Sequence, residues 1–289
     1  MRNSIYLFLI IITSCFGCTQ STTDSISEKT HEVRDDMGRT VSIPIVPKRI
    51  ISLTPSISEL LYTFVDSNRI VGRSNWCDYP YAIKNKPAIN SYPLDIEALV
   101  RLKPDLILAK KGMISMQEIN KLEELKQTIF IQEYDLMKQI KRSARILVDI
   151  TKGDTVTFHQ WMDKLQMDTM PKITAKRFVA FTSVQPIYVF GTKTFLSQIV
   201  ESTGGVNCIQ SIDNPYPTID VEYILKANPE VYIFSSEGNK ELFFDTYPIL
   251  KRTAGYQHNQ LFVIEDSVMS RPGIRLPILI NALHSIFNS

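Results

Sequence analysis

Short apolar runs alternate along the chain with segments whose apolar residues recur at helical spacing. Short runs of mainly apolar residues, as at 49–53, 105–109 and 177–181, are typical of strands buried on both faces. Residues 57–64 and 136–149 carry apolar residues three and four apart, which predicts amphipathic helices. Helix and apolar strand in alternation predict an α/β protein whose parallel-type sheets are covered by helices.

One helix–strand unit occurs twice in the chain. Residues 95–109, DIEALVRLKPDLILA, resemble residues 220–234, DVEYILKANPEVYIF, at a constant offset of 125 residues. In each copy an Asp can cap a short helix, and a Pro ends that helix before a buried strand begins. The repeat therefore predicts two lobes of the same α/β type.

The predicted architecture is two Rossmann-like lobes with a ligand cleft between them. The N-terminal lobe is expected at residues 32–150 and the C-terminal lobe at residues 175–289. A single long, rigid helix is expected to join them over residues 151–174, mainly from the helical segment 154–170.

The N-terminal segment predicts an exported lipoprotein. Residues 5–12 are apolar but too few to span a membrane, as in a signal peptide. The four residues that end at Cys15 resemble a bacterial lipobox, with Cys18 as the alternative site of lipidation. Residues 1–18 are thus expected to be the signal and lipidation region, and residues 19–31 a flexible polar tether. A plain secretory signal is the alternative.

Composition and charge exclude several classes of function. The net charge of +2, without long basic runs, gives no basis for nucleic-acid binding. No P-loop, G-x-G-x-x-G or G-x-S-x-G motif is present, and none of the four histidines stands at metal-ligand spacing from another His or a Cys. We expect neither a cofactor nor a metal site. Cys77 and Cys208 fall in different halves and are expected to be separate thiols rather than a disulfide.

Polar strand ends and aromatic loops indicate a binding cleft. In open α/β sheets, ligands bind beyond the carboxyl ends of the strands, which here lead into residues 54–56, 110–112 and 235–237. Aromatic faces with a few polar groups suit a large, flat, partly apolar ligand, although the core of a lobe is the alternative place for such residues. The candidate ligand-binding residues are Thr54, Pro55, Trp76, Tyr79, Tyr92, Tyr216 and Arg271. Arg271 could meet a carboxylate or phosphate, or be a solvated loop arginine.

Several of these segments together resemble a known family. The lipobox, the stretch DDMGRTVSIP…PKRIISLTPSISELL and the strands KPDLILA and NPEVYIF are similar to substrate-binding proteins of ABC importers for cobalamin, ferric siderophores or haem. The resemblance covers essentially the whole chain after the signal segment. SNWCDYP and NPYPTIDVE are similar to ligand loops of cobalamin-binding members, whereas Tyr92 stands where those members carry a Trp.

The resemblance implies a partner and a role for the repeated glutamates. In such proteins one exposed Glu per lobe meets arginines of a dimeric permease, and these would be Glu97 and Glu222. The alternative is local, because a carboxylate in the first turn stabilises a helix by about 0.3–1 kcal/mol. Glu59 is a weaker candidate for the docking role.

The predicted function is therefore capture of a corrinoid or an iron complex and its delivery to an ABC permease. The protein would be exported and would contact the membrane only through its lipid, facing the periplasm or the cell exterior. The alternatives are an exported enzyme that uses cleft residues such as Ser56 and Glu237, and a binder of free metal ions, which the scattered histidines disfavour.

Overall fold

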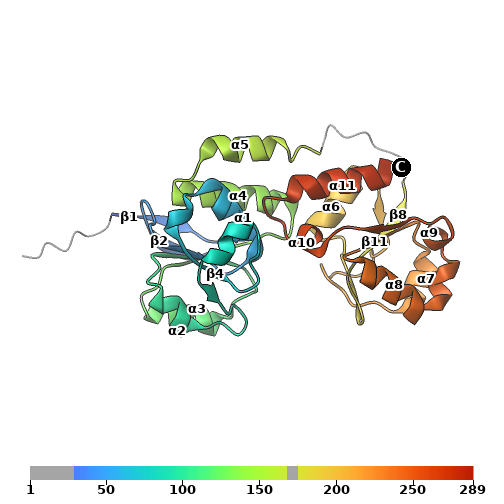
Figure 1. The fold of residues 1–289 in the computed structure, drawn as a ribbon, viewed down its shortest axis with the longest axis horizontal. Coiled ribbons are helices and arrows are strands. Elements are labelled where there is room, and N and C mark those ends of the chain that lie inside the picture. Colours follow the sequence, from blue (N-terminus) through green and yellow to red (C-terminus); the bar gives the residue numbers. More distant parts are fainter. Residues whose placement is uncertain (1–28, 168–174, 289) are drawn as a thin grey trace, which may run out of the picture.

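The computed structural model describes residues 29–167 and 175–288, which form two lobes (Figure 1). The predictions for residues 1–28, including both candidate lipidation sites, lie outside the described residues. Within the described part, no helix is long and apolar enough to cross a membrane.

The first lobe holds the elements β1 to α5. Its strands are β1 (Thr30–Arg34), β2 (Thr40–Pro44), β3 (Ile50–Ser52), β4 (Ile70–Ser74), β5 (Ala88–Ile89), β6 (Leu106–Lys110) and β7 (Ile129–Gln132). Its helices are α1 (Pro55–Phe64), α2 (Ile96–Arg101), α3 (Met116–Glu124), α4 (Met137–Thr151) and α5 (Thr155–Asp163), with short 3₁₀ turns η1 (Ser67–Arg69) and η2 (Tyr81–Asn85).

The second lobe holds the elements β8 to α11. Its strands are β8 (Arg177–Val184), β9 (Ile187–Val189), β10 (Val206–Asn207), β11 (Val231–Phe234) and β12 (Leu261–Val263). Its helices are α6 (Phe195–Ser202), α7 (Val221–Ala227), α8 (Glu237–Thr246), α9 (Ala254–Gln257), α10 (Asp266–Met269) and α11 (Leu276–Asn288), with the 3₁₀ turn η3 (Pro248–Arg252).

Both lobes are wound in the same way, which confirms the predicted pair of α/β lobes. The first sheet has the order β5-β4-β3-β6-β7, and all of its neighbouring pairs are parallel. The second sheet has the order β10-β8-β11-β12, also parallel, with β9 added to β8 as an antiparallel hairpin. In each lobe the first strand of the sheet lies in the centre, and later strands add on either side of it.

The segment between the lobes differs from the single long helix predicted over 151–174. The chain forms α4, breaks at Lys152 and Gly153, and then forms α5, which is nine residues long. After Asp163 the N–H groups of Lys164 and Leu165 bond to carbonyls three residues back, so the last turn tightens and the helix ends. Residues 168–174 lie outside the described residues.

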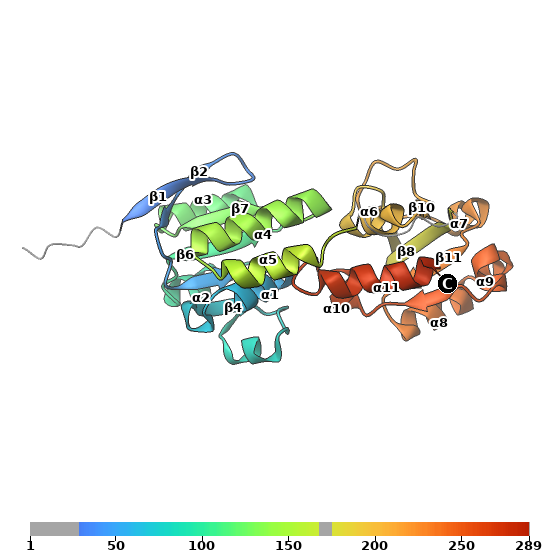
Figure 2. The same cartoon turned by 90° about the horizontal axis from the view of Figure 1, so that it is seen from above.

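A continuous buried core crosses the boundary between the lobes. It contains Phe64 and Trp161 of the first lobe, whose rings lie 5.8 Å apart, together with Phe178 and Leu279 of the second. The indole N–H of Trp161 also donates to the carbonyl of Ile274, at 3.1 Å. Figure 2 shows α5 and α11 one after the other along the long axis of the molecule. The two lobes are therefore joined by packing as well as by the chain.

Candidate functional site

A cavity of about 430 Å³ lies at the carboxyl ends of β3, β4, β6 and β7. This is the edge at which β4 and β6 diverge to opposite sides of β3, the switch point where open α/β sheets bind ligands. The lining residues are Thr54, Pro55, Ser56, Trp76, Lys110, Met113, Tyr134, Ser270, Arg271 and Pro272. Ser270 to Pro272 belong to the second lobe, so the cavity lies between the lobes, as predicted.

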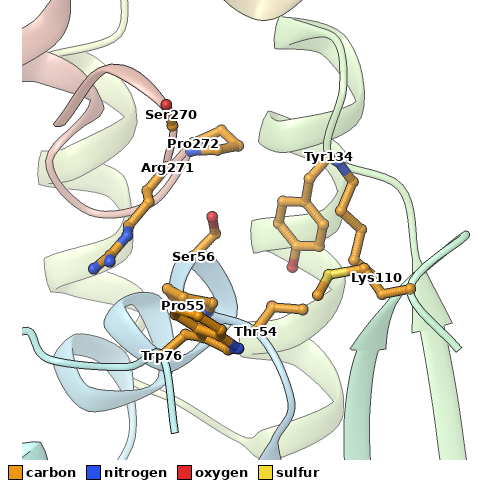
Figure 3. Close-up of a pocket in the computed structure, with 10 residues that line it drawn as sticks. Thr54, Pro55, Ser56, Trp76, Lys110, Tyr134, Ser270, Arg271 and Pro272 are labelled. Carbon is orange, nitrogen blue, oxygen red and sulfur yellow. The ribbon is translucent and has the colours of Figure 1, made fainter. Parts of the chain in front are cut away.

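The two lobes face each other across this cavity (Figure 3). Ser270, Arg271 and Pro272 follow α10 on one side, and Tyr134 and Lys110 lie on the opposite side. Trp76 follows β4, and the residue is 62% exposed at the rim. Thr54 is buried, and its hydroxyl oxygen has no hydrogen-bond partner within the described chain. The wall is thus mostly apolar and aromatic, with few polar groups, as is usual for small-molecule sites.

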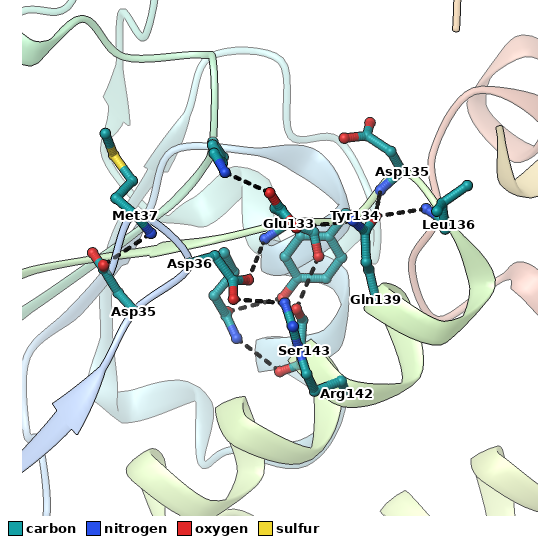
Figure 4. A network of polar contacts seen from close by, with 12 residues as sticks. Asp35, Asp36, Met37, Glu133, Tyr134, Asp135, Leu136, Gln139, Arg142 and Ser143 are labelled. Atoms are coloured by element: carbon teal, nitrogen blue, oxygen red, sulfur yellow. Dashed lines mark hydrogen bonds and ion pairs between the residues drawn. The ribbon is translucent and has the colours of Figure 1, made fainter. Parts of the chain in front are cut away.

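A polar network fixes the turn that carries Tyr134 (Figure 4). The backbone N–H of Glu133 donates to Asp36, at 2.7 Å, and Asp36 is also paired with Arg142, at 2.6 Å. The side-chain oxygen of Gln139 accepts from two successive N–H groups, those of Asp135 and Leu136. The phenol of Tyr134 donates to Gln132, at 3.0 Å. This part of the wall is therefore preorganised before any ligand arrives.

The phenol of Tyr134 is held in its protonated, hydrogen-bonded form. The residue is almost fully buried, and this burial raises the pKa of its hydroxyl well above the usual range. Ionising the phenol would also remove the proton that it donates to Gln132. Tyr134 therefore presents a neutral aromatic ring to the cavity.

Both cations of the cavity form ion pairs with carboxylates of the chain. Lys110 contacts Asp135, with 2.6 Å between Nζ and Oδ1. Arg271 of the second lobe meets both carboxylate oxygens of Asp78 in the first lobe. Burial opposes ionisation of Asp78, but the hydrogen bond and the charge of Arg271 outweigh it and lower the pKa of this carboxyl. The Arg271 pair therefore holds the lobes together at the edge of the cavity.

A second, buried ion pair joins the lobes behind the cavity. Arg275, just before α11, donates to both oxygens of Glu59 on α1, at 2.7 and 3.2 Å. Burial raises the pKa of Glu59, although Arg275 acts in the opposite direction. The guanidinium also lies 4.5 Å from the ring centre of Tyr79, in a cation–π contact. Tyr79, predicted as a ligand contact, thus has a partner within the protein.

The structure brings only part of the predicted ligand set to the cavity. Thr54, Pro55, Trp76 and Arg271 line it, as do Ser56 and Lys110 at the predicted strand ends. The other three predicted residues, Tyr79, Tyr92 and Tyr216, and the strand end at residues 235–237 do not line it.

The positions of these tyrosines have separate physical causes. Tyr79 lies against Arg275, and Tyr92 is 81% exposed on the loop between β5 and α2. Tyr216 packs its ring 5.6 Å from that of Phe190, and burial raises the pKa of its hydroxyl to about 12. Tyr216 therefore extends the core of the second lobe.

Sequence reasoning missed four lining residues: Met113, Tyr134, Ser270 and Pro272. Tyr134 follows β7 at the same carboxyl edge as the predicted strand ends, so the strand-end rule could have found it. Met113 lies only one residue beyond the predicted segment 110–112. Ser270 and Pro272 flank Arg271 and carried no signal of their own.

The repeated glutamates occupy equivalent, exposed positions. Asp95 and Asp220 cap α2 and α7 by accepting from the N–H groups of Ala98 and Tyr223, at 2.9 and 2.7 Å. Glu97 and Glu222 follow in the first turn of each helix. Both are exposed, and within the described residues neither side chain forms an ion pair or hydrogen bond. Figure 1 places both helices away from α5 and α11.

The two thiols are separate, as predicted. Cys77 is buried at 3.0 Å from the hydroxyl of Ser58, and Cys208 is half-buried in the other lobe. Burial raises the pKa of both thiols, that of Cys208 to about 12. Among the described residues, no group of three or more His, Cys, Asp or Glu is placed to hold a metal ion.

Two doubly wound lobes that share a cavity at their boundary define a bilobed solute-binding protein. Residues 50–268, more than half of the chain, match the family described as periplasmic binding protein. The chain belongs to this family.

Known relatives and solved structures agree with this assignment. The vitamin B12-binding protein of Vibrio cholerae serotype O1 is 28% identical over 201 residues, which cover 67% of this chain and 72% of that protein. The crystal structure of the periplasmic vitamin B12-binding protein BtuF of Vibrio cholerae has a TM-score of 0.71 at 22% identity, covering 84% of this chain and 97% of that one. A periplasmic haem-binding protein from Pseudomonas aeruginosa has a TM-score of 0.72 at 18% identity, covering 84% and 93%. The relatives are binding proteins, and the solved structures support the fold.

Proposed function

We propose that this protein is an exported, lipid-anchored binding protein that takes a corrinoid or an iron complex into the interlobe cavity. It then delivers the ligand to an ABC permease, which it meets through Glu97 and Glu222. The observation that carries the proposal is the cavity itself, which lies at the switch point of the first sheet and is closed by Ser270 to Pro272 of the second lobe. The relatives named for vitamin B12 and haem binding support the ligand class.

The size and wall of the cavity fit one part of a flat macrocycle. About 430 Å³ is within the usual range of roughly 300–1,000 Å³ for small-molecule sites but is less than a whole corrinoid needs. The ligand would place one edge in the cavity and lie with the rest of its face over Trp76, whose exposed ring is available for stacking.

Binding without catalysis is the role that the lining residues support. They include Ser56, yet none of them is a His, a Cys or a carboxylate that could activate its hydroxyl, and Lys110 is already paired with Asp135. Glu237, the other residue considered for an enzyme, is at the start of α8 and pairs with Lys240. An enzyme would need a base within hydrogen-bond reach of its nucleophile.

Ligand binding is expected to stabilise the purified protein against heat. Binding to the native state alone adds about 2.7 kcal/mol when free ligand is at 100 times its Kd. Thermal melts with cyanocobalamin, haemin and ferric siderophores test this, and Trp76→Ala should reduce the gain. Tyr81→Ala, an exposed aromatic outside the lining, is the control and should not. No shift with any of these ligands would overturn the proposed function.

The lipid anchor is expected on Cys15. In a bacterial host fed radiolabelled palmitate, Cys15→Ser should lose the label and Cys18→Ser should keep it, because residues 12–15 fit the lipobox better. The opposite pattern would move the anchor to Cys18, and a wild-type chain without label would contradict lipidation altogether.

A further inference from the structure

The cavity is lined by two charged residues, Lys110 and Arg271, one from each lobe. Two cations at the edge of a binding cavity would ordinarily attract the carboxylates or phosphates of a ligand. The side chains of Lys110 and Arg271 are only 26% and 18% exposed, so little water is available to screen their charges. What these cations already contact therefore decides which ligands the cavity favours.

Each cation already has its own carboxylate. Asp135 pairs with Lys110 at 2.6 Å, and Asp78 holds Arg271 through both carboxylate oxygens. Neither aspartate is among the lining residues, and both are more exposed than the cations they neutralise, at 36% and 48%. The carboxylates lie outside the cavity wall and leave it close to neutral.

Both carboxylates are held in place by the fold. The turn that contains Asp135 is fixed by Gln139, which accepts from the N–H of Asp135 at 3.1 Å, and by the network around Glu133 (Figure 4). Asp78 stays ionised because Arg271 lowers the pKa of its carboxyl against the effect of burial. A ligand carboxylate could reach either cation only by sharing it with a carboxylate that is already placed, beside a like charge.

We propose that Asp78 and Asp135 make the cavity selective for ligands whose periphery is neutral, such as the amide-bearing ring of a corrinoid, over rings that carry free carboxylates, such as haem. This inference rests on the proposed function and narrows its ligand class. A peripheral amide is neutral, so its oxygen can accept from a donor that the cation has left over without being repelled by the paired aspartate. A peripheral carboxylate at the same donor would lie near the like charge of the paired aspartate and meet a cation whose charge is already neutralised.

Matched ligands test this selectivity. Isothermal titration of the purified protein would compare cyanocobalamin with each of its mono-acids, in which one propionamide is replaced by a carboxylate, and with haemin. We expect cyanocobalamin to bind at least about tenfold more tightly than any mono-acid that places its carboxylate in the cavity, and more tightly than haemin. Asp78→Asn and Asp135→Asn should each raise the affinity for such a mono-acid about tenfold relative to cyanocobalamin, because each frees a cation.

The control variant is Glu230→Gln, which removes a carboxylate that pairs with Arg177 at the opposite end of the second sheet and should leave the ratio unchanged. Equal wild-type affinities for cyanocobalamin and all the mono-acids, or tighter binding of haemin, would overturn the selectivity and leave the proposed function standing. No binding of any of these probes would overturn the selectivity, and only together with the absence of a thermal shift by ferric siderophores would it overturn the proposed function. If an Asn variant fails to fold, the ratio of the wild-type affinities for cyanocobalamin and for the mono-acids decides the question alone.

Discussion

Glu97→Arg combined with Glu222→Arg is expected to reduce ligand uptake by cells to background while the affinity for ligand stays unchanged. A permease built from two equivalent halves presents the same surface twice, and a bilobed protein matches it best with the same charge on each lobe. Two exposed carboxylates that have no partner within the described residues satisfy this requirement. Under the proposed docking, reversing both charges would place like charges against the arginines expected on the permease, which costs several kcal/mol.

The measurement is uptake of radiolabelled cyanocobalamin by cells that carry each variant, together with the Kd of the purified protein. Glu32→Arg with Glu241→Arg is the matched control, since it makes the same change of charge at one exposed glutamate of each lobe, on β1 and α8. Full uptake in the Glu97/Glu222 variant would contradict the docking role. Equal loss of uptake in the control would mean that the change of net charge, and not docking through Glu97 and Glu222, causes the loss.

Helix stabilisation alone explains these glutamates incompletely. Asp95 and Asp220 already accept from the first-turn N–H groups, so the caps of α2 and α7 are satisfied without Glu97 or Glu222. The dipole contribution of a first-turn carboxylate, about 0.3–1 kcal/mol, would be equally available to Asp. The capping box of α3 shows the contrast, because there Glu118 stands at the third position and bonds back to Ser115.

The fold could be predicted because its signals are local. Apolar runs and the repeat at residues 95–109 and 220–234 gave the parallel strands and the two lobes, and each capping Asp was found from its own neighbourhood. The extent of α5 was missed because its end depends on a tightened last turn at Lys164 and Leu165, for which the sequence carries no Pro or Gly signal.

Site residues could be predicted from the sequence by a general rule only where they directly follow a strand of the sheet. Thr54, Pro55 and Lys110 follow strands, so the rule for carboxyl ends brings them together. The contacts of Arg271 with Asp78 and of Arg275 with Tyr79 join residues almost 200 positions apart, and no pattern within either segment specifies them. The sequence therefore assigned Tyr79 to the ligand without showing that its ring also contacts Arg275 of the protein.

The buried ion pair of Glu59 and Arg275 between the lobes is expected to have a large effect on stability. Arg275→Met is expected to lower the free energy of unfolding by about 3–5 kcal/mol at neutral pH, because it leaves the Glu59 carboxylate buried without its partner. Glu59 is 1% exposed and Arg275 10% exposed in this pair. Arg177→Met, which breaks the exposed pair with Glu230, is the control and should cost about 1 kcal/mol or less. Denaturant unfolding monitored by fluorescence measures both.

The cost of Arg275→Met should shrink as the pH falls. Burial already raises the folded-state pKa of Glu59, and loss of Arg275 removes the hydrogen bond and the charge that oppose this rise. A carboxyl whose pKa is higher in the folded than in the unfolded protein favours folding when protonated, and this contribution is lost as pH rises through the folded pKa. Unfolding at pH 7.5 and at pH 5 should therefore show the smaller difference from wild type at pH 5.

Replacing both partners, Glu59→Leu with Arg275→Met, should recover much of the stability because no buried charge is left unpaired. A pH-independent loss, or a double variant no more stable than Arg275→Met, would mean that packing against Tyr79 and not charge accounts for the role of Arg275.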